Sequence, residues 1–177
     1  NSSSSNYSVS ASTEQGAGPA WHLMNNNLST EDYWRTDAGT FDGSGNGDEW
    51  IELSLVVAKA FNKYRVQNYH VSANRFIDWA IEARVLNTDS WTVLHTITGN
   101  ASLGMSAYLT FTNATEYFFY RLRVTKTSNT TAILEELQFF EAEATNASIK
   151  DNNGIFPGAK IKTSDGNTYA IDSISGN

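Results

Sequence analysis

The sequence predicts an all-β fold of seven or eight short antiparallel strands, arranged as a sandwich or a barrel. Apolar and polar residues alternate in short runs from Trp21 to about Glu141, and clusters of Asn, Asp, Gly and Ser separate the runs every 8–15 residues. Only residues 29–36 and 58–63 have a pattern that could hold a helical turn, and both stretches are short.

The alternating runs assign an inward and an outward face to each strand, because successive side chains of a strand point to opposite sides. The inward faces are expected to carry Ile51, Leu53, Leu55, Trp79, Ile81, Ala83, Val85, Phe118, Tyr120, Leu122 and Val124. Polar residues between them, such as Glu52, Glu82 and Arg121, would face water. Further strands are expected at 64–71, 91–97, 107–112 and 133–140.

The side chains of the five tryptophans could either pack in the core or form an exposed platform for a ligand. Trp21, Trp50, Trp79 and Trp91 lie within or beside alternating runs, which predicts packing in the core rather than an exposed stacking surface.

The chain is expected to have three parts: an N-terminal arm or loosely held first strand at 1–19, a main domain at 20–141 and an extension at 142–177. In the extension, 159–163 and 168–171 flank Ser164-Asp165-Gly166-Asn167, the pattern of a β-hairpin. A lone hairpin is marginally stable in water, so it would dock on the domain, a second subunit or a following domain. The start at Asn1, without Met or a signal segment, suggests a processed product or a fragment.

Composition excludes several classes of function. Hydrophobic residues make up 40% of the 177 residues and aromatic residues 12%, which is enough for a sizeable core and argues against disorder. A net charge of −7 without a basic stripe argues against a nucleic-acid partner. No apolar run approaches the roughly 18 residues of a membrane span. The absence of cysteine removes disulfides and thiol chemistry.

Four segments in order resemble the discoidin-like domains, also called coagulation-factor C-type or galactose-binding-like domains, which include the family 32 carbohydrate-binding modules. They are Ala20–Trp34 with its Asn25-Asn26-Asn27 loop, Asp48–Leu55, Trp79–Leu94 with its second tryptophan, and Tyr120–Val124 together with Ile133–Phe139. The resemblance implies a jelly-roll β-sandwich. Two departures are the amide Asn25 where the family usually has an acid, and the missing terminal cysteines, which favour a prokaryote or a virus of prokaryotes as the source.

The resemblance also implies two sites. A structural calcium ion would be held by Asn25, Asn27 and Thr30, with Glu136 from the end of the domain. The alternative is that the Asn-rich loop is simply a turn whose side chains bond the backbone.

A glycan would be bound by loops at one end of the sandwich. The expected ligand-binding residues are His70, Asn74, Arg75, Phe76, Phe41 and Asp42, with Asn74 and Arg75 hydrogen-bonding hydroxyl groups and Phe76 stacking on the sugar. Phe76 could instead close the bottom of the sandwich, His70 could be satisfied by backbone at a strand end, and Trp34 on a neighbouring loop is expected in the core.

Catalysis is not expected. The three histidines are not spaced as metal ligands, and neither HExxH nor GxSxG occurs. The adjacent acids Asp48-Glu49 and Glu135-Glu136 would point to opposite faces of a strand, so neither pair could act on one bond.

These observations favour a non-catalytic carbohydrate-binding or adhesion module on a secreted or surface-displayed protein. One alternative is a structural domain of a virion appendage or surface layer, assembled as an oligomer through the C-terminal hairpin. Another is a non-catalytic appendage of a glycoside hydrolase. Seven sequons allow glycosylation or simply reflect a polar surface: Asn1, Asn6, Asn27, Asn100, Asn113, Asn129 and Asn146.

Overall fold

The computed structural model describes residues 6–16, 18–24, 32–70 and 73–141, and the backbone of 160–162 and 168–170. The chain divides into two compact units, Asn1–Glu143 and Ala144–Asn177. None of the helical structure within the described ranges is long and apolar enough to cross a membrane.

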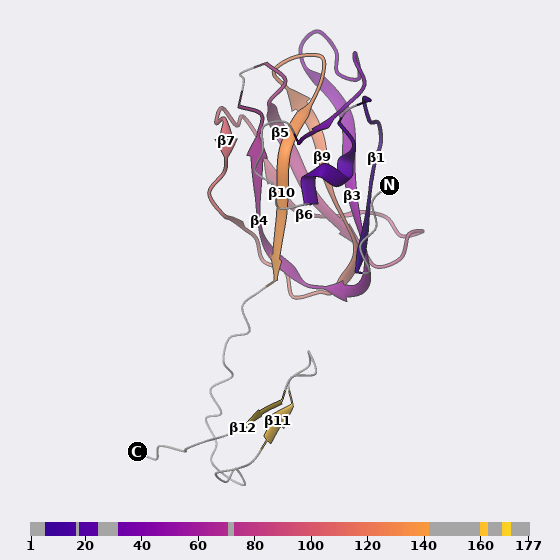
Figure 1. Cartoon of the computed structure of the whole chain (residues 1–177), viewed down its shortest axis with the longest axis vertical. Coiled ribbons are helices and arrows are strands. Elements are labelled where there is room, and N and C mark those ends of the chain that lie inside the picture. The colour runs from indigo at the N-terminus through magenta and orange to yellow at the C-terminus, as the bar shows by residue number, and fades with distance from the viewer. Residues whose placement is uncertain are drawn as a thin grey trace. The chain divides into compact units, whose positions relative to one another are not determined.

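The first unit is a sandwich of two antiparallel sheets (Figure 1). Sheet A has the order β1–β3–β9–β5–β6, with β1 at Tyr7–Ala11, β3 at Asn46–Lys59, β9 at Tyr117–Thr127, β5 at Phe76–Arg84 and β6 at Thr92–Ile97. Sheet B has the order β2–β10–β4–β7, with β2 at Trp34–Arg35, β10 at Ile133–Glu141, β4 at Phe61–Asn68, β7 at Gly104–Met105, and β8 at Leu109–Thr110 also paired with β4. A short 3-10 helix, η1 at Ala20–Met24, contacts β10, β1 and β2. The predicted all-β jelly roll is confirmed.

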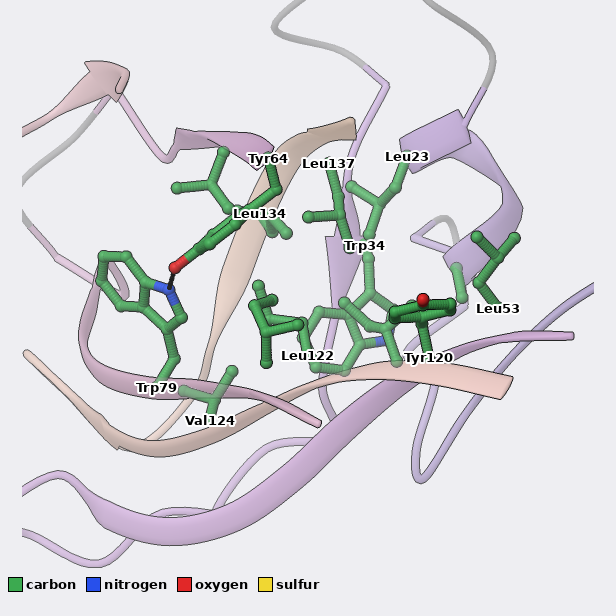
Figure 2. Close-up of a cluster of buried hydrophobic side chains, with 14 of the residues drawn as sticks. Leu23, Trp34, Leu53, Tyr64, Trp79, Tyr120, Leu122, Val124, Leu134 and Leu137 are labelled. Atoms are coloured by element: carbon green, nitrogen blue, oxygen red, sulfur yellow. Dashed lines mark hydrogen bonds between the residues drawn. The ribbon is translucent and has the colours of Figure 1, made fainter. Parts of the chain in front are cut away.

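The core lies between the sheets, where the apolar members of the alternating runs meet (Figure 2). Trp34, Ile51 and Leu122 are fully buried. The buried Tyr64 hydroxyl accepts a hydrogen bond from Trp79 Nε1 at 3.1 Å and lies 3.0 Å from His95 Nδ1. Burial raises the pKa of Tyr64 to about 12 and lowers the pKa of His95.

The prediction that four tryptophans pack in the core is right for Trp79 and wrong for the other three. Trp21 is 37% exposed, and Trp50 and Trp91 are half-buried. Trp50 neighbours the inward Ile51 on β3 and therefore takes the outer face. Two guanidinium groups contact the Trp91 ring, with the Cζ atoms of Arg84 and Arg121 each 4.2 Å from its centre.

Two further expectations about local structure are corrected. Residues 58–63 form no helical turn, because β3 runs to Lys59 and β4 begins at Phe61, with an irregularity between Ser54 and Lys59. Val85 was expected inside but lies one residue beyond β5 and is 40% exposed. Of the two forms expected for 1–19, an arm or a first strand, the described part contains a strand: β1 pairs along the edge of sheet A, where Val9 lies opposite Leu53 and is 2% exposed.

The second unit contains the expected hairpin. Strands β11 (Lys160–Lys162) and β12 (Thr168–Ala170) pair antiparallel, with Ile161 opposite Tyr169. The stretch between the strands, 163–167, includes the Asp-Gly turn and lies outside the described residues.

Candidate ligand-binding site

Four loops meet at the end of the sandwich where β4 and β9 end and β3, β5 and β10 begin (Figure 1, top). They are the β2–β3 loop at 36–45, the β4–β5 loop at 69–75, the β6–β7 loop at 98–103 and the β9–β10 loop at 128–132. We call this group of loops the loop end. Residues 71 and 72 within it are not described.

Backbone hydrogen bonds join the β2–β3 and β4–β5 loops to the β9–β10 loop. Phe41 N donates to Thr130 O at 3.3 Å, which anchors the β2–β3 loop. Ser128 N donates to Arg75 O at 3.0 Å, which anchors the β4–β5 loop. The sequence-predicted residues of both loops therefore belong to one group of connected loops, although they are more than 25 positions apart in the chain.

Asn74 and Arg75 form the corner of the β4–β5 loop. Asn74 has a φ of 68°, in the left-handed region that asparagine tolerates better than most residues, and its carbonyl accepts from Ile133 N at 2.9 Å. Arg75 N donates to Ser128 Oγ at 3.2 Å. Arg75 Nε is buried and has no hydrogen-bond partner among the described residues. A buried donor of this kind is costly unless a ligand or water accepts from it.

His70 presents a half-exposed imidazole, with 48% of its side chain accessible. Its Nδ1 lies 2.5 Å from Oε1 of Glu135, a fully buried carboxylate whose Oε2 accepts from Gln67 Nε2 at 2.7 Å. Since a carboxylate only accepts, Nδ1 is the donor in this pair. The hydrogen bond to the buried Glu135 therefore fixes the orientation of the His70 ring. The opposite nitrogen, Nε2, then accepts from a ligand when the ring is neutral and donates when it is charged.

The two phenylalanines predicted to contact the ligand are in the core instead. Phe76 is 0% exposed and packs edge-on to Trp34, and Phe41 is 1% exposed. Phe76 begins β5, and an irregularity between Phe76 and Asp78 leaves its ring between the sheets. Neither ring can stack on a sugar in this structure, so the stacking role predicted for Phe76 and the contact predicted for Phe41 are wrong.

Asp42 is exposed and organises its own turn. Its carboxylate accepts from the backbone of Ser44 at 2.8 Å and of Asn46 at 2.9 Å, and from Asn46 Nδ2 at 3.1 Å. These hydrogen bonds, those of Asn46 foremost, lower the pKa of Asp42. With its oxygens used by the turn, Asp42 is a weaker candidate for a sugar contact than His70.

Sequence reasoning missed Gln67 and Glu135 as supports of the site. The register of β10 against β4 shifts between Leu134 and Glu136, so the strand does not alternate there. Glu135 and Glu136 are consequently both buried, at 0% and 1% exposed, which corrects the expectation of opposite orientations. In the sequence, the adjacent acids Glu135 and Glu136 within a predicted strand are the feature that could have indicated this bulge.

For the expected calcium ligands the structure describes only Glu136, because Asn25, Asn27 and Thr30 lie outside the described residues. Glu136 is buried, and its Oε1 accepts from Gln138 Nε2 at 3.2 Å. Within the described ranges no group of three His, Cys, Asp or Glu residues could hold a metal ion.

The two sheet orders and the loops gathered at one end define a discoidin-like jelly roll, the fold of the family 32 carbohydrate-binding modules. No family model matches this sequence, and no curated protein matches it. The similarity is to solved structures, among them three that are 16–21% identical to this chain, and it establishes the fold.

Three of these structures illustrate the kinds of protein in which this fold occurs. The family 32 module of Clostridium perfringens NanJ, solved with galactose, is 19% identical with a TM-score of 0.62, over 76% of this chain and 93% of that one. A chitosan-binding module from a Paenibacillus chitosanase/glucanase is 21% identical with a TM-score of 0.60, over 76% and 95%. A Ruminococcus gnavus fucosidase, solved with fucose, is 16% identical with a TM-score of 0.63, over 78% of this chain and 26% of the enzyme.

Proposed function

We propose that this chain is a non-catalytic carbohydrate-binding module that binds a sugar at the loop end through His70, Asn74 and Arg75. The observation that supports this most is the half-exposed His70 imidazole, whose orientation is set by the buried Glu135. A polar group whose rotamer is fixed from beneath loses little entropy when it binds a hydroxyl. Arg75 lies five positions after His70 on the same loop, and its buried Nε is a donor without an acceptor among the described residues.

The sugars found in structures of the same fold support this class of ligand. They include galactose, GalNAc-β-1,3-galactose and 4,5-unsaturated mannuronic acid, each bound to a module similar to this chain. We propose galactose- or glucosamine-type sugars for the loop end. A shallow site of this kind binds weakly, with a Kd on the order of micromolar to millimolar, so function would gain from several copies on one assembly.

Replacing His70 with alanine is expected to weaken sugar binding about tenfold, because one hydrogen bond to a charged or polarised group is lost. Titrations of the folded protein with galactose, N-acetylgalactosamine and glucosamine, followed by NMR shifts, measure this directly. Thr96→Ala, an exposed change on β6 outside the four loops of the loop end, is the matched control and should bind as the parent does.

The loop-end proposal fails if a glycan array at high protein density is blank. It also fails if His70→Ala and Asn74→Ala bind a sugar as tightly as Thr96→Ala does. Melting temperatures of all variants establish that any loss is not caused by unfolding.

We propose that the module is extracellular and appended to a carbohydrate-active protein. Support comes from the fucosidase, in which the matched region is 26% of the chain. The alternative of a virion or surface-layer assembly domain, with an oligomer formed through the β11–β12 hairpin, stays a prediction. Sedimentation of the whole protein separates the two, since an oligomer that buries the loop end would favour assembly.

Glycosylation also stays a prediction. Of the sequon asparagines that the structure describes, Asn100 and Asn113 donate Nδ2 to backbone carbonyls, Asn113 to Phe61 O at 2.9 Å and Asn100 to Phe76 O at 3.4 Å. A glycan attached to either nitrogen would leave it one N–H, so each asparagine could keep only one of its two hydrogen bonds to backbone carbonyls.

The calcium expectation remains a proposal as well, with Asn25, Asn27, Thr30 and Glu136 as ligands. The buried Glu136 carboxylate fits such a role, because a cation offsets the cost of burying the charge. Chelation with EDTA is then expected to lower the melting temperature by several degrees, and added Ca²⁺ to restore it. An unchanged melting temperature after exhaustive chelation would exclude a structural ion.

A further inference from the structure

The outer face of sheet B brings aromatic rings and cations together. The register of β4 against β10 places Lys63 opposite Phe140 and Arg65 opposite Gln138. Tyr108 immediately precedes β8, which pairs with β4 at Lys63 and Tyr64. Side chains alternate along these strands, so the residues beside the buried Tyr64 point outward. We call this group the sheet-B platform: Lys63, Arg65, Tyr108, Gln138 and Phe140.

The rings of the platform are packed against each other yet open to solvent. Tyr108 is 53% exposed and stands edge-on to Phe140, with ring centres 5.2 Å apart and planes at 84°. Lys63 Nζ lies 5.0 Å from the Tyr108 ring centre, and Arg65 Cζ lies 5.3 Å from it. A supported aromatic ring with an open surface is the feature on which the C–H face of a pyranose lies.

The platform cations differ from the arginines of sheet A. On the outer face of sheet A, Arg84, Arg121 and Arg123 each form an ion pair with a carboxylate. Among the ion pairs of the described residues, none includes Lys63 or Arg65. In a chain with a net charge of −7, two neighbouring cations that form no ion pair among the described residues provide a local site for an anion.

The nearest acidic link to the platform runs through Gln138 and lies beneath the surface. Arg65 Nε donates to Gln138 Oε1 at 2.6 Å, and Gln138 Nε2 donates to Glu136 Oε1. Glu136 is 1% exposed, so its carboxylate orients Arg65 from below without covering it.

A hollow adjoins the platform and provides room for a ligand longer than one ring. It has a volume of about 460 Å³, and its lining includes Arg65, Gln138 and Phe140 from the platform, the buried Glu136, and Tyr7 and Phe61 beyond it. This hollow lies away from His70 and Asn74, neither of which lines it.

We propose that the sheet-B platform is a second saccharide-binding site, and that it takes an acidic saccharide. One pyranose ring lies against Tyr108, and its carboxylate or sulfate is held by Lys63 and Arg65. The site is independent of the loop end, so each of the two proposals can fail without the other.

Migration in native gels containing a polysaccharide tests the proposal with the whole chain. Polygalacturonate and dextran sulfate are expected to retard or shift the protein at 50 mM salt, whereas neutral dextran is not. Tyr108→Ala and Lys63→Gln should each weaken the apparent affinity about fivefold or more. Lys126→Gln on β9 removes the same charge from sheet A and is the matched control, expected to behave as the parent. His70→Ala should also leave this binding unchanged.

The outcomes separate the alternatives. An effect of only one polymer identifies the anion and supports the proposal. No effect of either polymer overturns it, as does equal weakening by Lys126→Gln and Lys63→Gln, which would indicate general charge attraction. Equal binding of poly-L-glutamate would show that no sugar ring is recognised and would also overturn it. Loss in His70→Ala alone would assign the binding to the loop end and reject the platform. Circular dichroism melts confirm that the variants are folded.

Discussion

Replacing Trp34 with alanine is expected to lower the free energy of unfolding by about 3–5 kcal/mol, the range typical of buried Trp or Phe truncation. The indole is 0% exposed and packs edge-on to Phe76 with ring centres 6.2 Å apart. Its Nε1 also donates to Thr13 O at 2.9 Å, which holds the segment after β1 against β2. Truncation leaves a cavity and an unsatisfied carbonyl together. Urea denaturation measures the loss.

Trp21→Ala is the matched control for this prediction. It removes the same side chain from η1, where the ring is 37% exposed and contacts His22. We expect a loss of no more than about 1 kcal/mol, because little cavity can form at the surface. Equal losses in the two variants would mean that Trp34 is not the core residue described here.

Replacing Glu82 with alanine is expected to cost about 3–5 kcal/mol, although Glu82 lies on the outer face of sheet A. The carboxylate is 3% exposed because Arg121 and Arg123 cover it. Arg121 Nε donates to Oε2, and Arg123 lies 3.7 Å from Oε1. Without Glu82, the largely buried Arg121 guanidinium, whose side chain is 16% exposed, loses its ion pair and keeps its contact with the Trp91 ring.

Asp48→Ala provides the comparison on the same face. Asp48 pairs with Arg123 through two hydrogen bonds, and this arginine holds the pKa of Asp48 below its usual value. The Asp48 side chain is 58% exposed, so water and salt screen the pair and its loss should cost less than about 1 kcal/mol. Raising NaCl from 0.15 M to 1 M should abolish the small stability cost of Asp48→Ala and largely leave that of Glu82→Ala unchanged. Chemical denaturation at the two salt concentrations measures both costs. Similar costs at low salt would refute the role assigned to burial.

The alternation of side chains predicted the fold well and the orientation of some aromatic residues poorly. Leu122 was placed correctly because it lies between two polar neighbours, Arg121 and Arg123. Trp50 and Trp91 were misplaced because a tryptophan fits either face of a sheet when cations or strand edges cover its outer side. Local pattern alone has no information about what covers an outer face.

The candidate site was predicted in part. The β4–β5 loop was identified through its resemblance to discoidin-like domains, and in the structure His70, Asn74 and Arg75 do lie at the loop end. Glu135 was missed because the bulge in β10 depends on pairing with β4, a strand more than 60 positions earlier in the chain. Phe76 was assigned to the ligand because a loop boundary was expected where β5 already begins.

The sequence by itself determined that this chain folds as a sandwich of antiparallel strands, because the period of two between apolar residues is a local property of the backbone. Only the tertiary structure decided which polar groups are buried, which loops meet, and which cations lack an acidic neighbour. Those features arise from contacts between distant segments, as when Lys63 meets Phe140 and Arg121 meets Glu82. The binding chemistry proposed for the loop end and for the sheet-B platform therefore depends on strand register rather than on any contiguous motif.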